Sequence, residues 1–436
     1  MIPKKEDMNG VNLVFEEDRT VPLVYLYVDF HFGTEIDPED KIGRLRLAAH
    51  LLKLGTKKKS REELNRAIES IGADLDLSAG HHHLSLSAHS ISESFDALTD
   101  IVREILHEPG LRRDDFEQLR RETIADIIES RQDDQGLAGR NFRAMLFGAH
   151  PYGRRTAGRR KNLEALDYRE TADLIRSHLG KGRITIGGVG DISREKFIEK
   201  ARLIVDGIST LEMPPSDVPE PQPPQGVRVR LVDKPDRTQA QIYMGHLGAW
   251  AWDENYFPLV VLNTAFGGTF TARLSEEIRR KRGMSYGAYS RILRSRKRDA
   301  FYLWTFPSIE NAAEVIRVQL GMMEELKADA LTDEEHDFAV KYLSNHFLFA
   351  VETAPLRVSL AIREILQNLP PDFFETYREN IRGVTQEEVR AAAAGFIDPR
   401  NICISVLCTA DRVRDKLQQE LEDYSPSMET VPYDDD

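Results

Sequence analysis

The stretch RLRLAAHLLKLGT, residues 44–56, indicates most directly which kind of fold the chain adopts. Its apolar residues recur every three or four positions, which predicts an amphipathic helix that ends near a glycine. One face of this helix carries Arg46, Ala49, His50 and Lys53. The opposite face carries Leu47, Leu51 and Leu54. We therefore expect His50 to lie on the polar face of a helix that packs on a core.

The residue types on the polar face decide what chemistry the helix can perform. A zinc-binding helix of this form would need histidines at 46 and 50, a glutamate base at 49 and a carboxylate ligand from another helix. Arg46 has no lone pair for zinc, and Ala49 cannot accept a proton. Arg46 and Lys53 also disfavour a further positive charge at His50. We therefore expect no metal at this helix, and no cofactor in this chain.

A proline-rich segment, PPSDVPEPQPPQG, divides the chain into two halves with similar patterns. Each half begins with apolar strands, continues with amphipathic helices and closes with a helix followed by a strand. Runs of strands and of helices are typical of an α+β fold. We predict two tandem homologous α+β domains, each a sheet with helices on one face. Their predicted boundaries are 1–213 and 227–436, with a linker at 214–226.

Several local signals support the predicted helices. Capping boxes are predicted at Ser60 with Glu63 and at Thr385 with Glu388. The segments at 111–128 and 331–348 are predicted to be equivalent helices, since each has acidic residues near its start followed by apolar periodicity.

Bulk composition excludes some function classes. A formal net charge of −13 argues against general nucleic-acid binding, which requires basic surface. The two cysteines, Cys403 and Cys408, lie five positions apart on a predicted strand, so we expect small buried residues rather than a disulfide. No signal peptide or membrane span is visible. We expect a cytoplasmic protein, or a periplasmic one if a signal peptide has been removed.

A second motif, FGGTFTARLSEEIRRKRGMSYGAYS, occupies residues 266–290. We predict a helix from Thr271 to Arg282, a left-handed cap at Gly283 and then a strand that contains Tyr286. The spacings of Glu276–Arg280 and Glu277–Lys281 predict ion pairs on the helix surface. From spacing alone, Arg279 is an ordinary solvated arginine.

The order of these features resembles the pitrilysin/insulinase family of inverted zinc peptidases (inverzincins). The matching features are Gly43, HLLKLGT at 50–56, Ser60, GADLDLSAG at 72–80 and HPYGRRTAG at 150–158. The resemblance covers essentially the whole chain, including the duplication, and is closest to the short bacterial branch whose subunits work in pairs. It places Asp126 at the second-ligand position, 76 residues after His50.

The resemblance also assigns roles in the second half. In the family, an arginine and a tyrosine seven residues later serve catalysis and substrate binding, and here they match Arg279 and Tyr286. The chain would then be the non-zinc subunit of a heterodimeric zinc metalloendopeptidase that cleaves peptides. A homologous partner containing HxxEH would supply the zinc, and this chain would be inactive alone.

The stretch GHHHLSLSAHS, at 80–90, leaves several interpretations open. On a strand, His81 and His83 would share one face and His82 the other. They could line a substrate-binding cleft, form plain surface or hold a metal. Two further functions follow as alternatives: a catalytically inactive structural, assembly or peptide-binding homolog, and a homodimeric hydrolase with a non-standard metal site on this strand.

Overall fold

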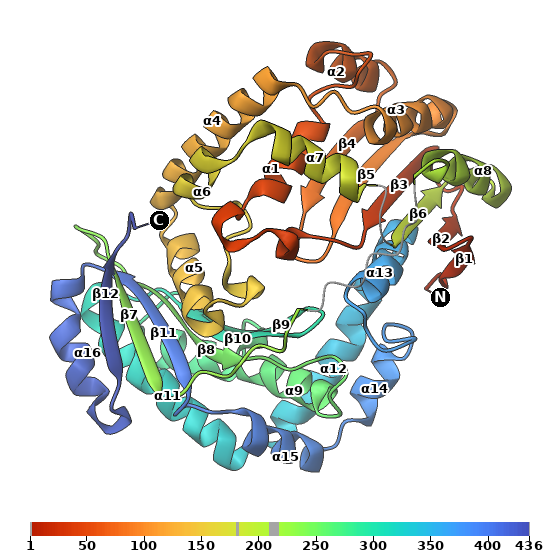
Figure 1. Cartoon of the computed structure of the whole chain (residues 1–436). Coiled ribbons are helices and arrows are strands. Elements are labelled where there is room, and N and C mark those ends of the chain that lie inside the picture. The colour runs from red at the N-terminus through yellow and green to blue at the C-terminus, as the bar shows by residue number, and fades with distance from the viewer. Residues whose placement is uncertain (1, 180–182, 209–217, 436) are drawn as a thin grey trace. The chain divides into compact units, whose positions relative to one another are not determined.

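The computed structural model describes residues 2–179, 183–208 and 218–435, which form two compact units (Figure 1). The first unit comprises Met1–Ile128, Arg155–Val218 and Phe349–Glu375. The second comprises Glu129–Arg154, Pro219–Leu348 and Thr376–Asp436. Within the described residues each unit holds one six-stranded sheet with helices packed on it, which confirms the predicted α+β class.

The two units do not coincide with the two halves of the sequence, because each half contributes one segment to the other unit. Segment 129–154 of the first half belongs to the second unit, and segment 349–375 of the second half belongs to the first unit. The predicted end of the first domain at 213 and the first linker residues, 214–217, lie outside the described residues.

The sheet of the first unit has the strand order β1-β2-β6-β3-β5-β4. Strands β2 and β6 pair in parallel, and the other neighbours are antiparallel. The strands are β1 (Glu6–Met8), β2 (Val11–Glu17), β3 (Leu23–Phe30), β4 (Asp74–Ala79), β5 (Leu84–Ile91) and β6 (Ile184–Gly190).

The sheet of the second unit repeats this plan, with the order β12-β7-β11-β8-β10-β9. Strands β7-β11-β8-β10-β9 match β2-β6-β3-β5-β4 in order and direction, which confirms the predicted duplication. The strands are β7 (Val227–Asp233), β8 (Gln241–Leu247), β9 (Ala288–Arg294), β10 (Arg298–Thr305), β11 (Ile402–Cys408) and β12 (Ser427–Pro432).

The helices of the first unit include the two predicted at 44–56 and 111–128. They are α1 (Arg44–Leu52), α2 (Arg61–Ser70), α3 (Phe95–His107), α4 (Arg113–Glu129), α6 (Arg160–Ala165), α7 (Tyr168–His178), α8 (Arg194–Val205) and α13 (Ala354–Leu366).

The helices of the second unit include two π-helical turns, η6 (Thr264–Gly268) and η7 (Glu276–Lys281). The α-helices are α5 (Asp134–Phe147), α9 (Tyr256–Asn263), α10 (Arg273–Ser275), α11 (Ala312–Asp329), α12 (Asp333–Ala350), α14 (Tyr377–Gly383), α15 (Gln386–Phe396) and α16 (Arg414–Glu420). Both predicted capping boxes are present, at the starts of α2 and α15.

The central strand of each sheet is covered on both faces. All seven residues of β6 and all seven of β11 are buried, including Cys403 and Cys408, whose predicted burial is confirmed. Gly188 of β6 packs under Phe197 of α8, whereas the adjacent Gly187 faces Ile362 of α13. Because adjacent residues of a strand point to opposite faces, α8 and α13 cover different faces.

The second sheet is covered in the same way. On β8, Tyr243 contacts Phe142 of α5, while His246 contacts Phe396 of α15. Figure 1 shows α5 lying along this sheet. The predicted layer of helices on one face is therefore present in each unit, and a helix from the other half of the chain adds a second layer.

The described part of the proline-rich segment forms neither helix nor strand. Pro221 and Pro224 are buried while the residues between them are exposed, which fits the three-residue turn of an extended polyproline chain. Glu220 accepts from Arg298 Nε at 3.2 Å, which helps to hold the segment on the second unit.

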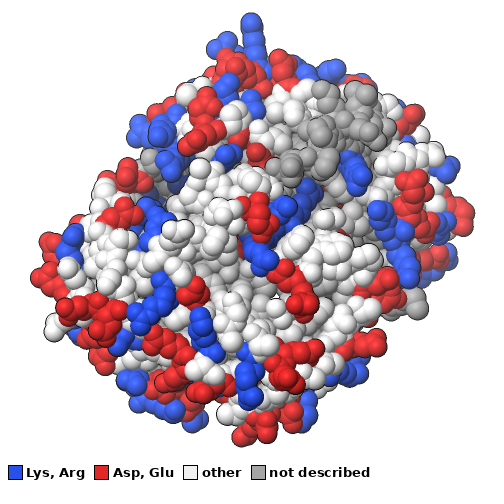
Figure 2. All heavy atoms as spheres, turned by 60° about the horizontal axis from the view of Figure 1, so that its bottom comes forward, with Lys and Arg blue, Asp and Glu red and all other residues white. Residues whose placement is uncertain are grey.

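The surface carries both signs of charge. On the face shown in Figure 2, basic and acidic side chains are interspersed. No helix within the described ranges is long and apolar enough to cross a membrane.

The close strand pairing around Gly245 yields a stability prediction. A Cβ added to Gly245 would overlap the carbonyl oxygen of Phe301 and lie 2.7 Å from Tyr302 Cα, both on the paired strand. We expect Gly245→Ala to lower the free energy of unfolding by about 1–3 kcal/mol, because backbone cannot move aside easily. Thermal unfolding followed by circular dichroism measures the change.

Gly321→Ala is the matched control, because a Cβ there meets no atom within 4 Å. Its expected effect is neutral or a gain of up to about 1 kcal/mol, since alanine is favoured within a helix. Equal melting temperatures for Gly245→Ala and the wild type would contradict the packing argument.

Candidate functional site

The start of α1 is held by a buried carboxylate. The backbone N–H groups of Gly43 and Leu45 donate to Asp37 at 3.1 Å, and Asp37 is 1% exposed. Burial raises the pKa of Asp37 to about 6, and the hydrogen bonds and Arg44 oppose this rise. A Cβ at Gly43 would lie 2.7 Å from the carbonyl oxygen of Ala157, which belongs to HPYGRRTAG. That segment therefore has a structural role in seating α1.

The three residues of α1 at the positions that a zinc-binding helix would use, Arg46, Ala49 and His50, have different environments. Arg46 is exposed and His50 is half-buried. Ala49 is fully buried within the core, so its expected place on the polar face is wrong. The apolar face of α1 is wider than the sequence spacing indicated, because neighbouring elements cover this side of the helix as well.

His50 lies in a setting that disfavours positive charge, as predicted. Burial lowers the pKa of His50, and Arg46 and Lys53 lower it further, while Asp76 and Asp126 act in the opposite direction. The Lys53 ammonium donates to Asp76 at 2.7 Å, which occupies one of those two carboxylates. Asp126 itself is exposed on α4.

These residues do not fit a zinc site. His50 and Asp126 offer two ligand types, Arg46 offers none, and Ala49 offers no base. In the residues that the structure describes, no group of three or more His, Cys, Asp or Glu side chains could hold a metal ion. We therefore derive no metal chemistry from α1.

The Gly55–Thr56 landmark after α1 connects several elements. Gly55 has a φ of +118°, and Thr56 bonds the side chain of Glu104 on α3. The Arg112 guanidinium donates to the carbonyl oxygens of Thr56 and Lys59 at 2.7 and 3.0 Å. The landmark thus fixes the end of α1 against the loop before α4.

The three consecutive histidines of GHHHLSLSAHS, His81, His82 and His83, do not lie on a strand. They occupy the turn between β4 and β5, so the expected alternation of His81, His82 and His83 across a strand is wrong. His82 is buried, with Nδ1 3.7 Å from Glu35 Oε1. His81 and His83 are half-buried. The turn forms because the N–H of Gly80 donates to the carbonyl of His83 at 2.9 Å.

The segment that carries Arg279 is a π-helical turn rather than the predicted continuous α-helix. It follows the short helix α10, and the N–H of Arg282 donates to the carbonyl of Glu277, five residues earlier, at 3.1 Å. Gly283 has a φ of +63°, which confirms the predicted left-handed cap. Such wide turns recur at functional sites in proteins.

The neighbours of Arg279 on this turn are paired with carboxylates. Arg280 lies 2.7 Å from Glu276, and Lys281 lies 3.0 Å from Glu277, so both predicted ion pairs are confirmed. Within the described residues, Arg279 itself pairs with no carboxylate.

The guanidinium of Arg279 contacts two aromatic rings instead. Its Cζ lies 4.4 Å from the ring centroid of Tyr286 and 4.6 Å from that of Phe270. Tyr286 lies in the loop before β9 rather than within the predicted strand, and it is 73% exposed. The Ser285 hydroxyl, which is buried, donates to the carbonyl of Gly287 at 2.9 Å and so fixes this loop.

Phe270 was not among the site residues predicted from the sequence. Its neighbours Thr269 and Ala272 are buried, whereas Phe270 is 63% exposed. A phenylalanine two residues after the Gly-Gly pair was the available signal, but only the structure brings it to Arg279.

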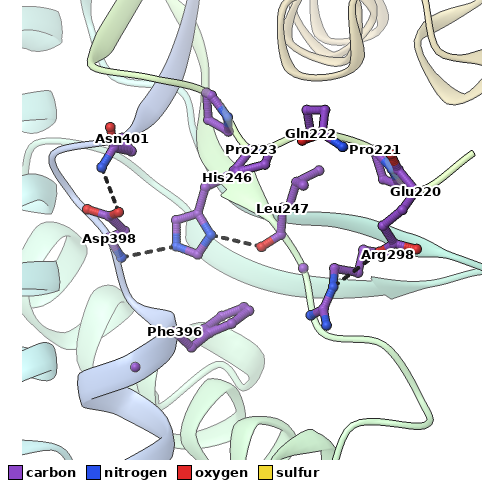
Figure 3. A pocket seen from close by; sticks show the side chains of 13 residues that line it. Glu220, Pro221, Gln222, Pro223, His246, Leu247, Arg298, Phe396, Asp398 and Asn401 are labelled. Carbon is purple, nitrogen blue, oxygen red and sulfur yellow. Dashed lines mark hydrogen bonds and ion pairs between the residues drawn. The ribbon is translucent and has the colours of Figure 1, made fainter.

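A pocket of about 400 Å³ lies elsewhere in the second unit, beside the proline-rich segment (Figure 3). Its polar side chains already have partners within the protein. His246 accepts from the N–H of Asp398 at Nε2 and bonds the carbonyl of Leu247 through Nδ1, and Arg298 pairs with Glu220. Burial lowers the pKa of His246 to about 4. The sequence-predicted site residues do not line this pocket.

The chain is similar to known proteins over most of its length. Two family models match it: "Insulinase (Peptidase family M16)" over residues 12–160 and "Peptidase M16 inactive domain" over residues 165–343. Together they cover more than half of the chain. The chain therefore belongs to the M16 (insulinase) peptidase family, which confirms the predicted resemblance.

Individual relatives differ in what they are named. An uncharacterized zinc protease of Streptomyces coelicolor is 23% identical over 398 residues, which are 90% of this chain and 86% of that protein. A non-peptidase homolog of Helicobacter pylori is 18% identical over 383 residues, or 87% of each chain. The crystal structure of a peptidase M16 inactive domain from Pseudomonas fluorescens has a TM-score of 0.84 and 21% identity, and the match covers 93% of this chain and 98% of that one. Family membership thus leaves the activity to be argued from the residues.

The ligand set at α1 yields a metal-binding prediction. We expect the purified chain to hold no stoichiometric zinc at His50, because Arg46 cannot ligate and two cations oppose a third. Metal analysis of dialysed wild type beside His50→Ala should give equal zinc contents. A zinc-binding M16 peptidase carrying HxxEH serves as the positive control, and loss of one bound zinc on His50→Ala would contradict the prediction.

The buried His246 yields a pH prediction. Its pKa of about 4 in the folded state lies below the ordinary 6.5, so the unfolded chain binds the extra proton between these values. Acidification from pH 6.5 to pH 4 should therefore cost the wild type about 3 kcal/mol at this residue. In urea titrations across that range, His246→Gln should lack this part of the loss. Parallel pH profiles for the two proteins would show that His246 is not the cause.

Proposed function

We propose that this chain is the non-zinc subunit of a heterodimeric M16 peptidase, contributing substrate binding and transition-state stabilisation in trans. The observation that carries the proposal is the state of Arg279. Its guanidinium carbon lies over two aromatic rings and has no carboxylate partner among the described residues, while Arg280 and Lys281 beside it are both paired. An arginine held in this way keeps its N–H groups available for a ligand.

The chemistry of peptide hydrolysis gives the Arg279–Tyr286 pair a role. Negative charge develops on the carbonyl oxygen as the peptide bond is attacked, and preorganised donors aimed at that oxygen lower the barrier. The guanidinium of Arg279 offers five donors, and the exposed phenol of Tyr286 offers one more. We assign both residues to transition-state stabilisation and peptide binding.

The remaining parts would come from a homologous partner. A chain carrying HxxEH would supply the zinc, the general base and the attacking water, since Arg46 and Ala49 supply none of these. We propose His81 and His83, on the β4–β5 turn, as additional peptide-contacting residues. On this proposal the isolated chain is inactive.

A second candidate is a catalytically inactive homolog that binds peptides or assists assembly. The Helicobacter pylori relative named as a non-peptidase homolog favours it. In that case Arg279 and Tyr286 would contribute to affinity without affecting any hydrolysis. The two candidates are separated by whether a complex with an HxxEH chain cleaves peptides.

The test is co-expression with a homologous HxxEH chain, followed by assays on a library of quenched fluorescent peptides. We expect cleavage by the pair and none by this chain alone. Arg279→Ala should lower kcat/KM by about 10²–10³-fold and Tyr286→Phe by about tenfold, since each removes a donor from the developing oxyanion.

Arg280→Ala is the matched control, because Arg280 is the adjacent arginine and its side chain is 80% exposed. It should leave the rate unchanged. Equal activity of Arg279→Ala and wild-type pairs would reject the catalytic role. Peptide binding by a stable pair without any cleavage would favour the inactive homolog.

A further inference from the structure

We infer that Phe270 is a positioning residue that holds the Arg279 guanidinium in its working orientation. This inference rests on the proposed function of Arg279. It starts from one geometric fact: two rings, those of Phe270 and Tyr286, lie 4.6 and 4.4 Å from the same guanidinium carbon.

The kind of partner matters for what Arg279 can still do. A carboxylate partner would occupy the N–H edge of the guanidinium, as Glu276 does for Arg280 and Glu277 does for Arg282. An aromatic ring interacts with the face of the guanidinium instead and leaves its in-plane N–H groups available. Phe270 can therefore restrict the motion of Arg279 without using the donors that a peptide oxygen needs.

The backbone segment that carries Phe270 is held in place by contacts that do not involve Arg279. Gly267, three residues earlier, packs so closely on β9 that an added Cβ would lie 2.7 Å from the Ser290 nitrogen. On the other side, Arg273 bonds the carbonyl of Ala330 at 3.0 Å and pairs with Glu335 of α12. Phe270 thus projects from a segment that is anchored before and after it.

The exposure of Phe270 also needs an explanation. A phenylalanine side chain that is 63% exposed gains little from burial, although buried positions lie on both sides of it. Contact with the half-buried Arg279 gives this ring a specific role at that position. The π-helical turn contributes from the other side, because it sets the direction in which Arg279 leaves the backbone.

The first test needs no partner chain. In ¹H–¹⁵N spectra of the isolated protein, the Nε–H resonance of Arg279, assigned by its absence in Arg279→Lys, should show a ring-current shift. Phe270→Leu, which keeps the apolar bulk but removes the ring, should reduce that shift, and Phe270→Tyr should retain it. An unchanged Arg279 resonance in Phe270→Leu would overturn the inference.

The second test uses the active pair. Phe270→Leu should lower kcat about fivefold, the effect of one cation–π contact, with KM changed by less than about twofold. Phe270→Tyr should restore the wild-type rate. Phe338→Leu is the control, because Phe338 is also an exposed phenylalanine of this unit, at 43%, and lies on α12.

The outcomes separate the two claims. If Arg279→Ala impairs cleavage but Phe270→Leu does not, the positioning role is wrong and the proposed function stands. If Arg279→Ala leaves cleavage unchanged, the proposed function is wrong, and so is a role for Phe270 in it. A loss in Phe270→Leu that Phe270→Tyr does not restore would assign Phe270 to packing alone and overturn the inference.

Discussion

The fold depends on the burial of one strand in each sheet from both faces. Every residue of β6 and of β11 is buried, so neither sheet can face water at its centre. A single layer of helices covers only one face, and the second layer is supplied by α13 for the first sheet and α5 for the second. Each of these helices comes from the other half of the chain. The duplicated halves therefore complete their cores by exchanging helices.

The same dependence on packing explains why α1 is held firmly at both ends although it carries no zinc-binding residues at 46 and 49. Asp37 holds the start of the helix, and Gly55–Thr56 with Arg112 holds its end. These contacts serve the fold whether or not a metal binds. Ala49 fits this context, because it is fully buried, and a carboxylate there would need partners to offset desolvation.

The region around Arg279 differs from α1, because one of its charged side chains has no carboxylate partner among the described residues. Glutamates pair with Arg280, Lys281 and Arg282, so the local positive charge is largely balanced except at Arg279. The guanidinium carbon of Arg279 lies over the rings of Phe270 and Tyr286, and cation–π contacts of this kind use no N–H donor. In the first unit, α1 keeps its structural contacts without zinc ligands, and in the second unit one guanidinium has no carboxylate partner among the described residues.

Local sequence patterns were sufficient to predict the α+β class, the duplication, both capping boxes, the Gly283 cap and the two ion pairs of the Arg279 turn. All of these follow from local periodicity or from residues a few positions apart. Local patterns did not predict the helix exchange, the burial of Ala49, the turn that carries His81 and His83, or the contact of Phe270 with Arg279. The helix exchange and the burial of Ala49 depend on residues distant in sequence, and so does the approach of Gly267 to Ser290, which fixes the backbone before Phe270.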